Sequence, residues 1–288
     1  MDRRTLLKGA GAMALAAPMP TLATAQNALP LAAPIHVGNV GLRTRDAEAM
    51  AEWYSMAVGL REIARDGNTI WMGAGGERLL ALTEVEGLRR AGPREAGLYH
   101  TAFLLPTRAD LGRWIYMAAS DRLPVDGSAD HRVSEAVYLT DPEGNGIEIY
   151  ADTPQDTWEW RDGEVTMGSL PLRVQEIVEA LGPMPTPWTG APTGTSVGHV
   201  HLKVGDAQQA GQWWRETLGF DAVSSRSDAV FLSTGGYHHH IAVNEWMSAG
   251  AGQRPENETG LAFVELVNTG GGSAAEYEDD WGTAIRLV

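Results

Sequence analysis

Two histidines and one glutamate in this sequence have the residue types and spacing of a metal site: His100, Glu148 and His201. Two neutral imidazole nitrogens and one carboxylate oxygen on one face of an ion suit Fe(II), or Mn(II), and leave open positions where a bidentate substrate and O2 could bind together. A single inward histidine in a β protein is more often a hydrogen-bonded core residue. Three such residues at matching points of related units favour a metal site instead.

An internal repeat defines the related units. The first unit, 37–84, reappears without a gap as the third unit, 197–244, at an offset of 160 residues. The second unit, 98–150, has the same order of predicted elements without that identity, and a shortened fourth unit begins after Gly260. A repeat of this length is one supersecondary unit used again.

Each full unit is predicted to fold as a strand, a helix and three strands. In the third unit the helix is expected over 207–218, because apolar residues recur at helical spacing between the N-cap Asp206 and Gly219. The second unit has its helix over 109–120, and a helix over 171–181 is expected in the Pro-rich connector. The expected strands of the second and third units are 99–105, 136–139, 147–150, 199–204, 220–224, 229–233 and 238–244.

Strand alternation decides which of the candidate residues face inward. Apolar Val200 and Leu202 should pack on the helix, which turns both His199 and His201 to the concave side. The same argument turns Glu148 inward, and position alone places His100 there. Of the two histidines on the third unit's opening strand, His201 is taken as the ligand.

A run of three histidines, His238, His239 and His240, follows a Gly-Gly turn in the third unit. If the strand begins at 238, alternation selects His240 as the one that faces the cavity. The alternative is a cluster exposed at the surface, or an adventitious metal binder.

Charge and composition restrict the partners. The formal net charge is −15, and removal of an N-terminal leader would leave −17, so nucleic acid is not expected to bind. The sequence contains no cysteine, so a metal must use His, Asp or Glu. After residue 26 no apolar run approaches the length of about 20 residues that a membrane span needs, and stable membrane insertion is not expected.

Residues 1–25 resemble a twin-arginine export signal, with Arg3-Arg4 before an apolar run and a small-residue cleavage pattern at Ala23-Thr24-Ala25. This predicts a periplasmic or secreted protein. The remainder divides into an N-terminal domain of two modules (35–154), a connector (155–194) and a C-terminal domain with one full and one shortened module (195–288).

The segments Gly97-Leu98-Tyr99-His100, 130–150, Gly198-His199-Val200-His201-Leu202 and 235–240 resemble the vicinal oxygen chelate superfamily, and within it the two-domain catechol 2,3-dioxygenase-like proteins. The resemblance covers about residues 35–267. It implies an α+β fold in which tandem βαβββ modules form curved mixed sheets around a metal-binding cavity, in two domains.

Site residues implied by the resemblance follow residue by residue. The iron ligands fall on His100, His201 and Glu148. A tyrosine ten residues before the ligand glutamate corresponds to Tyr138, and a histidine before that tyrosine to His131. A further histidine near the iron would be one of 238–240, and alternation selects His240.

The implied activity is that of a non-haem Fe(II) extradiol dioxygenase, which opens the ring of a catechol-type substrate with O2. Two alternatives share the fold: a metal-dependent lyase or isomerase of the glyoxalase type, with His240 as a fourth ligand, and a non-catalytic binding protein of the bleomycin-resistance type. A homo-oligomer is compatible with each.

One departure from the family pattern predicts how the units pair. The first unit has Gly41 where the third has His201, so pairing the first unit with the second would leave the site incomplete. We therefore expect the second unit to pair with the third across the connector.

Overall fold

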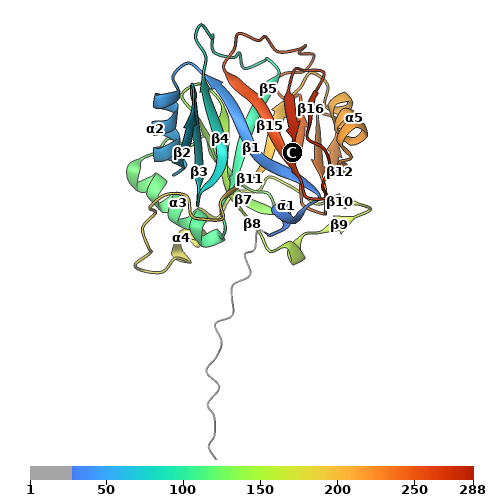
Figure 1. The fold of residues 1–288 in the computed structure, drawn as a ribbon. Helices are drawn as coiled ribbons and strands as arrows, with labels where there is room; N and C mark the ends of the chain where they lie inside the picture. Colours follow the sequence, from blue (N-terminus) through green and yellow to red (C-terminus); the bar gives the residue numbers. More distant parts are fainter. Residues whose placement is uncertain (1–27) are drawn as a thin grey trace, which may run out of the picture.

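The structure, a computed structural model, describes residues 28–288 (Figure 1). The predicted leader, 1–25, lies outside the described residues. The strands form two large curled mixed sheets and one short hairpin, and helices pack against the sheets. This is the expected α+β architecture.

The larger sheet has eight strands and combines the second and third units. Its strand order is β12-β13-β14-β11-β5-β8-β7-β6. The bounds are β5 Gly97–Leu104, β6 Gly127–Asp130, β7 Ser134–Thr140, β8 Gly146–Asp152, β11 Ser196–Lys203, β12 Asp221–Arg226, β13 Ala229–Ser233 and β14 Ile241–Asn244. The two opening strands, β5 and β11, join the units by antiparallel pairing in the middle of the sheet.

The other sheet has seven strands and combines the first and fourth units, in the order β16-β17-β15-β1-β4-β3-β2. The bounds are β1 Ile35–Thr44, β2 Arg61–Asp66, β3 Thr69–Ala74, β4 Glu77–Glu84, β15 Gly260–Asn268, β16 Ala275–Glu278 and β17 Ala284–Leu287. The fourth unit has three strands and no helix, in agreement with its shortened sequence. β16 was not predicted, because four of the residues from 275 to 280 are acidic.

The predicted pairing of the second unit with the third is confirmed, and the structure also pairs the first unit with the fourth. Each sheet therefore takes one unit from before the connector and one from after it. The predicted domains 35–154 and 195–288 follow the order of the units in the sequence. In the structure each sheet instead contains one unit from each of these two ranges.

Helix boundaries follow from local capping. α5 spans Ala207–Leu218 as predicted, with the Asp206 carboxylate accepting from the amides of Gln208 and Gln209. It ends at Gly219, whose φ of +71° is the left-handed conformation that glycine adopts at low cost. The other helices are α1 Ala28–Ala32, α2 Ala47–Ala57, α3 Arg108–Asp121 and α4 Val174–Glu179.

One hydrophobic core joins α2, α3, α5 and the short helix of the connector to the convex faces of both sheets. Its largest fully buried side chains include Trp114 on α3, Trp214 on α5 and Tyr54 on α2. The Trp114 indole donates to the carbonyl oxygen of Ala57 at the end of α2, which ties the first unit to the second. Among residues 28–288, no helix is long and apolar enough to cross a membrane.

The first part of the connector folds over the concave side of the eight-stranded sheet, whereas its helix packs against α3. The connector contains the short hairpin of β9 Trp160–Arg161 and β10 Glu164–Val165, followed by α4, which is shorter than the predicted 171–181. A β-bridge joins Leu170 to Asp130 at the start of the loop that carries His131. The connector thus holds one wall of the concave side in place.

Gly146 allows β8 to approach β5 beside His100. A Cβ at this position would lie 2.1 Å from the carbonyl oxygen of Tyr99. We predict that Gly146→Ala lowers the free energy of unfolding by about 2 kcal/mol, because backbone atoms of two paired strands must move apart. Gly127→Ala is the control, since nothing lies within 4 Å of its added Cβ, and a change within about 0.5 kcal/mol is expected. Urea denaturation of both variants measures the difference; equal losses would contradict this packing account.

Candidate metal centre

The concave face of the eight-stranded sheet encloses a cavity of about 540 Å³. Both units supply its polar lining, which includes His100, Glu148, His199, His201 and His239. The side chains of His131 and Tyr138 also line it. The predicted site residues of the second unit therefore share one cavity.

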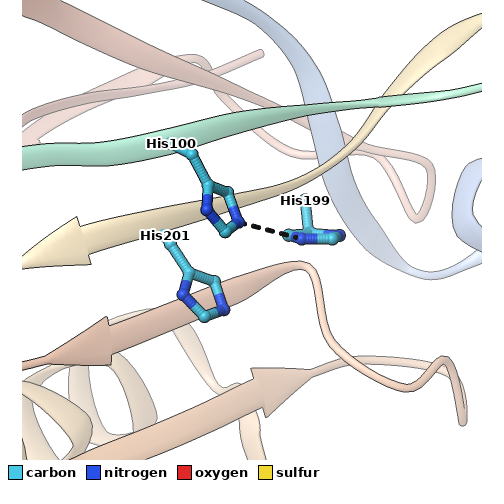
Figure 2. Close-up of side chains that lie close together, drawn as sticks. All are labelled: His100, His199 and His201. Carbon is cyan, nitrogen blue, oxygen red and sulfur yellow. Dashed lines mark hydrogen bonds between the residues drawn. The ribbon is translucent and has the colours of Figure 1, made fainter. Parts of the chain in front are cut away.

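Three buried atoms converge on one point of this cavity. Glu148 Oε2 lies 3.0 Å from His100 Nε2 and 3.2 Å from His199 Nε2, and the two nitrogens are 3.4 Å apart. Figure 2 shows the rings of His100 and His199 pointing toward each other, with His201 alongside His100. The described ligand atoms of His100, His199 and His201 all lie within 4.8 Å of one another.

The spacing of the three closest atoms fits a metal ion. Ligand atoms about 2.1 Å from a common metal are separated by about 3.0 Å at right angles and by about 3.4 Å in a tetrahedron. The observed separations of 3.0, 3.2 and 3.4 Å span this range. Two imidazoles and a carboxylate are also a donor set that Fe(II) and Mn(II) accept.

The charges around the three atoms favour cation binding. Burial alone would raise the pKa of Glu148, but the charges and hydrogen bonds of His199 and His100 outweigh it and hold that pKa well below its usual range. Burial lowers the pKa of His199 to about 4, against the opposing charge of Glu148. At neutral pH the site therefore offers an ionised carboxylate and a neutral imidazole, the forms that bind metals.

The β5–β11 register explains why His199, rather than the predicted ligand His201, reaches Glu148. A bulge at Val197/His199 puts His199 opposite Ala102 of β5, and Ala102 lies opposite Glu148 of β8. His199 and Glu148 thus share one row across three strands. Alternation along the strand could not separate the two histidines, because both face the concave side and only the bulge distinguishes them.

His201 has a different neighbour. It lies directly opposite His100, and their rings stack with centroids 4.5 Å apart. Its Nδ1 is buried without a hydrogen-bond partner, and burial holds its pKa well below the usual value, with the neighbouring imidazoles adding to the shift. This neutral ring lies beside the candidate ligand atoms and forms part of the cavity wall.

The structure brings the predicted pair His131 and Tyr138 into hydrogen-bond contact. His131 Nε2 is 2.5 Å from the Tyr138 hydroxyl, and His131 Nδ1 is 2.6 Å from the carbonyl oxygen of Gly168. A carbonyl only accepts, so Nδ1 donates, and Nε2 of the neutral ring accepts from Tyr138. Burial, with the charge of Glu148, raises the pKa of Tyr138, which keeps this hydroxyl protonated.

The expectation that His240 faces the cavity is wrong. β14 begins at Ile241, so residues 238–240 form part of a turn to which strand alternation does not apply. His240 is buried on the other side, with Nε2 3.3 Å from the carbonyl oxygen of Pro30 and Nδ1 3.2 Å from the Ser233 hydroxyl. His239 lines the cavity in its place.

His239 ends a buried hydrogen-bond chain that alternation did not predict. Asp152 Oδ1 accepts from His238 Nε2 at 3.0 Å, and His238 Nδ1 is 2.8 Å from His239 Nδ1. When His238 is neutral, its Nδ1 accepts and His239 Nδ1 donates. His239 Nε2, buried and without a partner, then keeps a lone pair beside His199, whose ring centroid is 4.1 Å away.

The seven-stranded sheet has the same register but different residues at the corresponding positions. Asn39 replaces His199, Phe263 replaces His100, and Arg286 replaces Glu148. The Arg286 guanidinium lies 3.8 Å from the centre of the Phe263 ring, and the Asn39 amide donates to Glu265. In this sheet an aromatic ring and a guanidinium therefore occupy the equivalent position, and the positive charge of Arg286 would repel a metal ion.

Comparisons with known proteins agree with this geometry. Residues 36–149 match the family model of the Glyoxalase/Bleomycin resistance protein/Dioxygenase superfamily. Catechol-2,3-dioxygenase of Bacillus subtilis (strain 168) is 35% identical over 237 residues, which are 81% of this chain and 82% of that protein. The chain belongs to this superfamily. The suspected resemblance is confirmed.

Two further relatives extend the comparison. Biphenyl-2,3-diol 1,2-dioxygenase 3 of Rhodococcus globerulus is 29% identical over 133 residues, covering 43% of this chain and 68% of that protein. The crystal structure of glyoxalase I from Zea mays superposes with a TM-score of 0.52 at 12% identity, covering 88% of this chain and 92% of that one. The latter likeness concerns the fold alone.

The two histidines of β11 give a direct test of the ligand set. We predict that His199→Ala weakens Fe(II) binding by at least about 100-fold, because a ligand is lost, whereas His201→Ala weakens it by less than about tenfold. Equilibrium dialysis under anaerobic conditions, followed by metal analysis, measures both. The reverse order of effects would return the ligand role to His201.

Proposed function

We propose that this protein is an Fe(II)-dependent extradiol dioxygenase that opens the ring of a catechol-type substrate. The observation that supports this most is the convergence of His100 Nε2, His199 Nε2 and Glu148 Oε2 in a cavity that also contains two separate proton acceptors. When bound by these residues, Fe(II) supplies a Lewis acid for two vicinal oxygens and open positions for O2.

His131 and Tyr138 would handle protons on the second unit's side of the cavity. Because Tyr138 donates to His131 Nε2, its own oxygen can accept from a substrate hydroxyl. A proton can then pass from the diol through the Tyr138 hydroxyl to His131 Nε2. The Gly168 carbonyl keeps the His131 ring in the tautomer that can receive it.

His239 would act on the third unit's side. Ring opening adds both atoms of O2 to the diol without net loss of protons, so a group that takes up a proton early must return one later. The unpartnered Nε2 of His239 can accept a hydrogen bond or a proton there. Asp152 and His238 hold the ring by its other nitrogen and thereby orient it.

Apolar side chains complete the cavity wall. Phe231 contacts both His201 and His239 edge-on, with ring centroids 5.5 and 5.2 Å away. Tyr99 and Trp246 line the cavity near its outer rim, and Trp246 is 42% exposed. A flat aromatic ring fits between such walls, and its entry would displace water from the ligand atoms.

Oxygen uptake separates this function from the glyoxalase type. Protein loaded anaerobically with Fe(II) and given catechol should consume O2 and form a yellow ring-opened product, and Glu148→Gln should abolish uptake because it weakens the metal site. Metal-dependent turnover of other substrates without O2 would instead indicate a lyase or isomerase. The fourth ligand first considered for that chemistry, His240, lies outside the cavity lining.

Tyr138 offers a test of proton handling that leaves the metal ligands intact. We predict that Tyr138→Phe lowers kcat for catechol cleavage by about 100-fold while the protein keeps its Fe(II) content. Tyr116→Phe on the exposed face of α3 is the matched control and should leave kcat unchanged. Steady-state oxygen uptake measures both variants, and full activity of Tyr138→Phe would remove Tyr138 from the reaction.

A further inference from the structure

Lys203 stands out because it is the only lysine in the part of the chain that the structure describes. The sequence has 22 basic residues, of which Lys8 and Lys203 are the lysines and the others are arginines. Lys203 ends β11 and lines the metal cavity together with His199 and His201. These alternate residues share one strand face, so the Lys203 backbone lies about 13 Å along β11 from that of His199.

This lysine has no anionic partner among the described residues. No carboxylate lies within ion-pair distance of it. The charge of Glu95 raises the pKa of Lys203. However, the Glu95 carboxylate already accepts hydrogen bonds from the Arg89 guanidinium and the Gly92 amide. Burial has the larger effect and lowers the pKa of Lys203. A partly buried cation without a counter-ion is unusual in a chain of net charge −15, and it favours an anionic ligand.

A second cation and an unpaired amide lie in the same row of the sheet. The register runs from Lys203 to Asn244, then to Ala229, then to Arg226. Asn244 is completely buried, and neither its Nδ2 nor its Oδ1 has a hydrogen-bond partner. Arg226 lines the cavity, lies 5.9 Å from the Phe231 ring centre and forms no ion pair in the described structure. Buried amides without partners are rare in folded proteins.

Space for a substituent exists beside Lys203. A second cavity, of about 410 Å³, shares Pro93, Leu98, Gly144 and Lys203 with the metal cavity. Its lining includes Arg254, whose pKa is lowered to about 10, mainly by burial and then by the charge of Arg43. The lining carboxylates Glu143 and Glu258 are already paired with Arg45 and Arg89.

We propose that the substrate is a catechol whose ring carries a carboxylate-bearing substituent, bound by Lys203 at the junction of the two cavities. This rests on the proposed dioxygenase function and specifies its substrate class. The ring diol would face His100, His199 and Glu148, and the carboxylate would lie toward Lys203. One exposed carboxylate, that of Asp126, also lines the metal cavity. It lies directly before β6 and accepts a hydrogen bond from the Thr140 hydroxyl.

Paired substrates of nearly equal shape test the proposal kinetically. With Fe(II)-loaded protein, kcat/KM for 3,4-dihydroxyphenylacetate should exceed that for 4-ethylcatechol by at least about tenfold, as a charge-assisted contact to a partly buried lysine implies. Lys203→Met should reduce this ratio by about tenfold or more, and Lys203→Arg should preserve most of it. Arg215→Met removes an exposed charge on α5 and should leave the ratio unchanged. Equal use of both catechols by the unmodified protein would overturn the proposal while the dioxygenase function stood.

A binding measurement keeps the proposal testable without turnover. Reductive methylation with ¹³C-formaldehyde labels Lys203 and the other primary amines of the protein, and the Lys203→Arg variant assigns the Lys203 signal. In the apo-protein, 3,4-dihydroxyphenylacetate should shift the Lys203 signal and leave the other methylamine signals in place, whereas 4-ethylcatechol should shift none of them. If no catechol supports O2 uptake, the proposed function fails, and the binding of the carboxylate by Lys203 is then decided by this measurement alone. A Lys203 signal that does not move with the acid would overturn the proposal.

Discussion

The antiparallel pairing of β5 with β11 is the constraint on which the site depends. It joins the opening strands of two units, which begin at Gly97 and Ser196, and a bulge at Val197/His199 shifts the register so that His199 shares a row with Glu148. The candidate ligand atoms of three strands meet only because of this shift. A shift of the β5–β11 register by one residue would turn the histidines of β11 toward the apolar core.

Duplication provided two such sheets, and only one keeps the donor set. Both have bulges at equivalent places in the opening strands, so the backbone frame is the same. In the seven-stranded sheet the Phe263 ring lies so close to Gly41 that an added Cβ would approach it to 2.2 Å. Aromatic packing and Arg286 therefore occupy the volume that a ligand pair would need. The chemistry of the superfamily depends on side chains, whereas the fold is common to both halves.

The sequence was sufficient to predict the units, the pairing of the second with the third, and most of the residues that line the cavity. Periodicity and the N-cap at Asp206 located α5 to the residue, and the absence of histidine at Gly41 predicted the pairing. His100, Glu148, His131 and Tyr138 were all placed in one cavity. Two histidine assignments depended on strand geometry that a sequence does not display. A bulge favours His199 over His201, and the late start of β14 exchanges His240 for His239.

The same limit applies to the hydrogen-bond chain from Asp152 to His239. Asp152, in β8, and His238, in the turn before β14, are 86 residues apart and meet only because β5 and β11 pair. Lys203 could have been noticed as the lysine nearest the candidate ligands, but its lack of a partner is a property of the folded chain. Residues that act through long-range contacts thus required the structure.

The central claim is that one ion binds between His100, His199 and Glu148 in the eight-stranded sheet. Anomalous diffraction from crystals of the metal-loaded protein tests it most directly. We predict a single strong peak within bonding distance of the two Nε2 atoms and a Glu148 oxygen, and none in the seven-stranded sheet. A peak coordinated by His201 or His239 in place of His199, or located beside Asn39, would contradict this account.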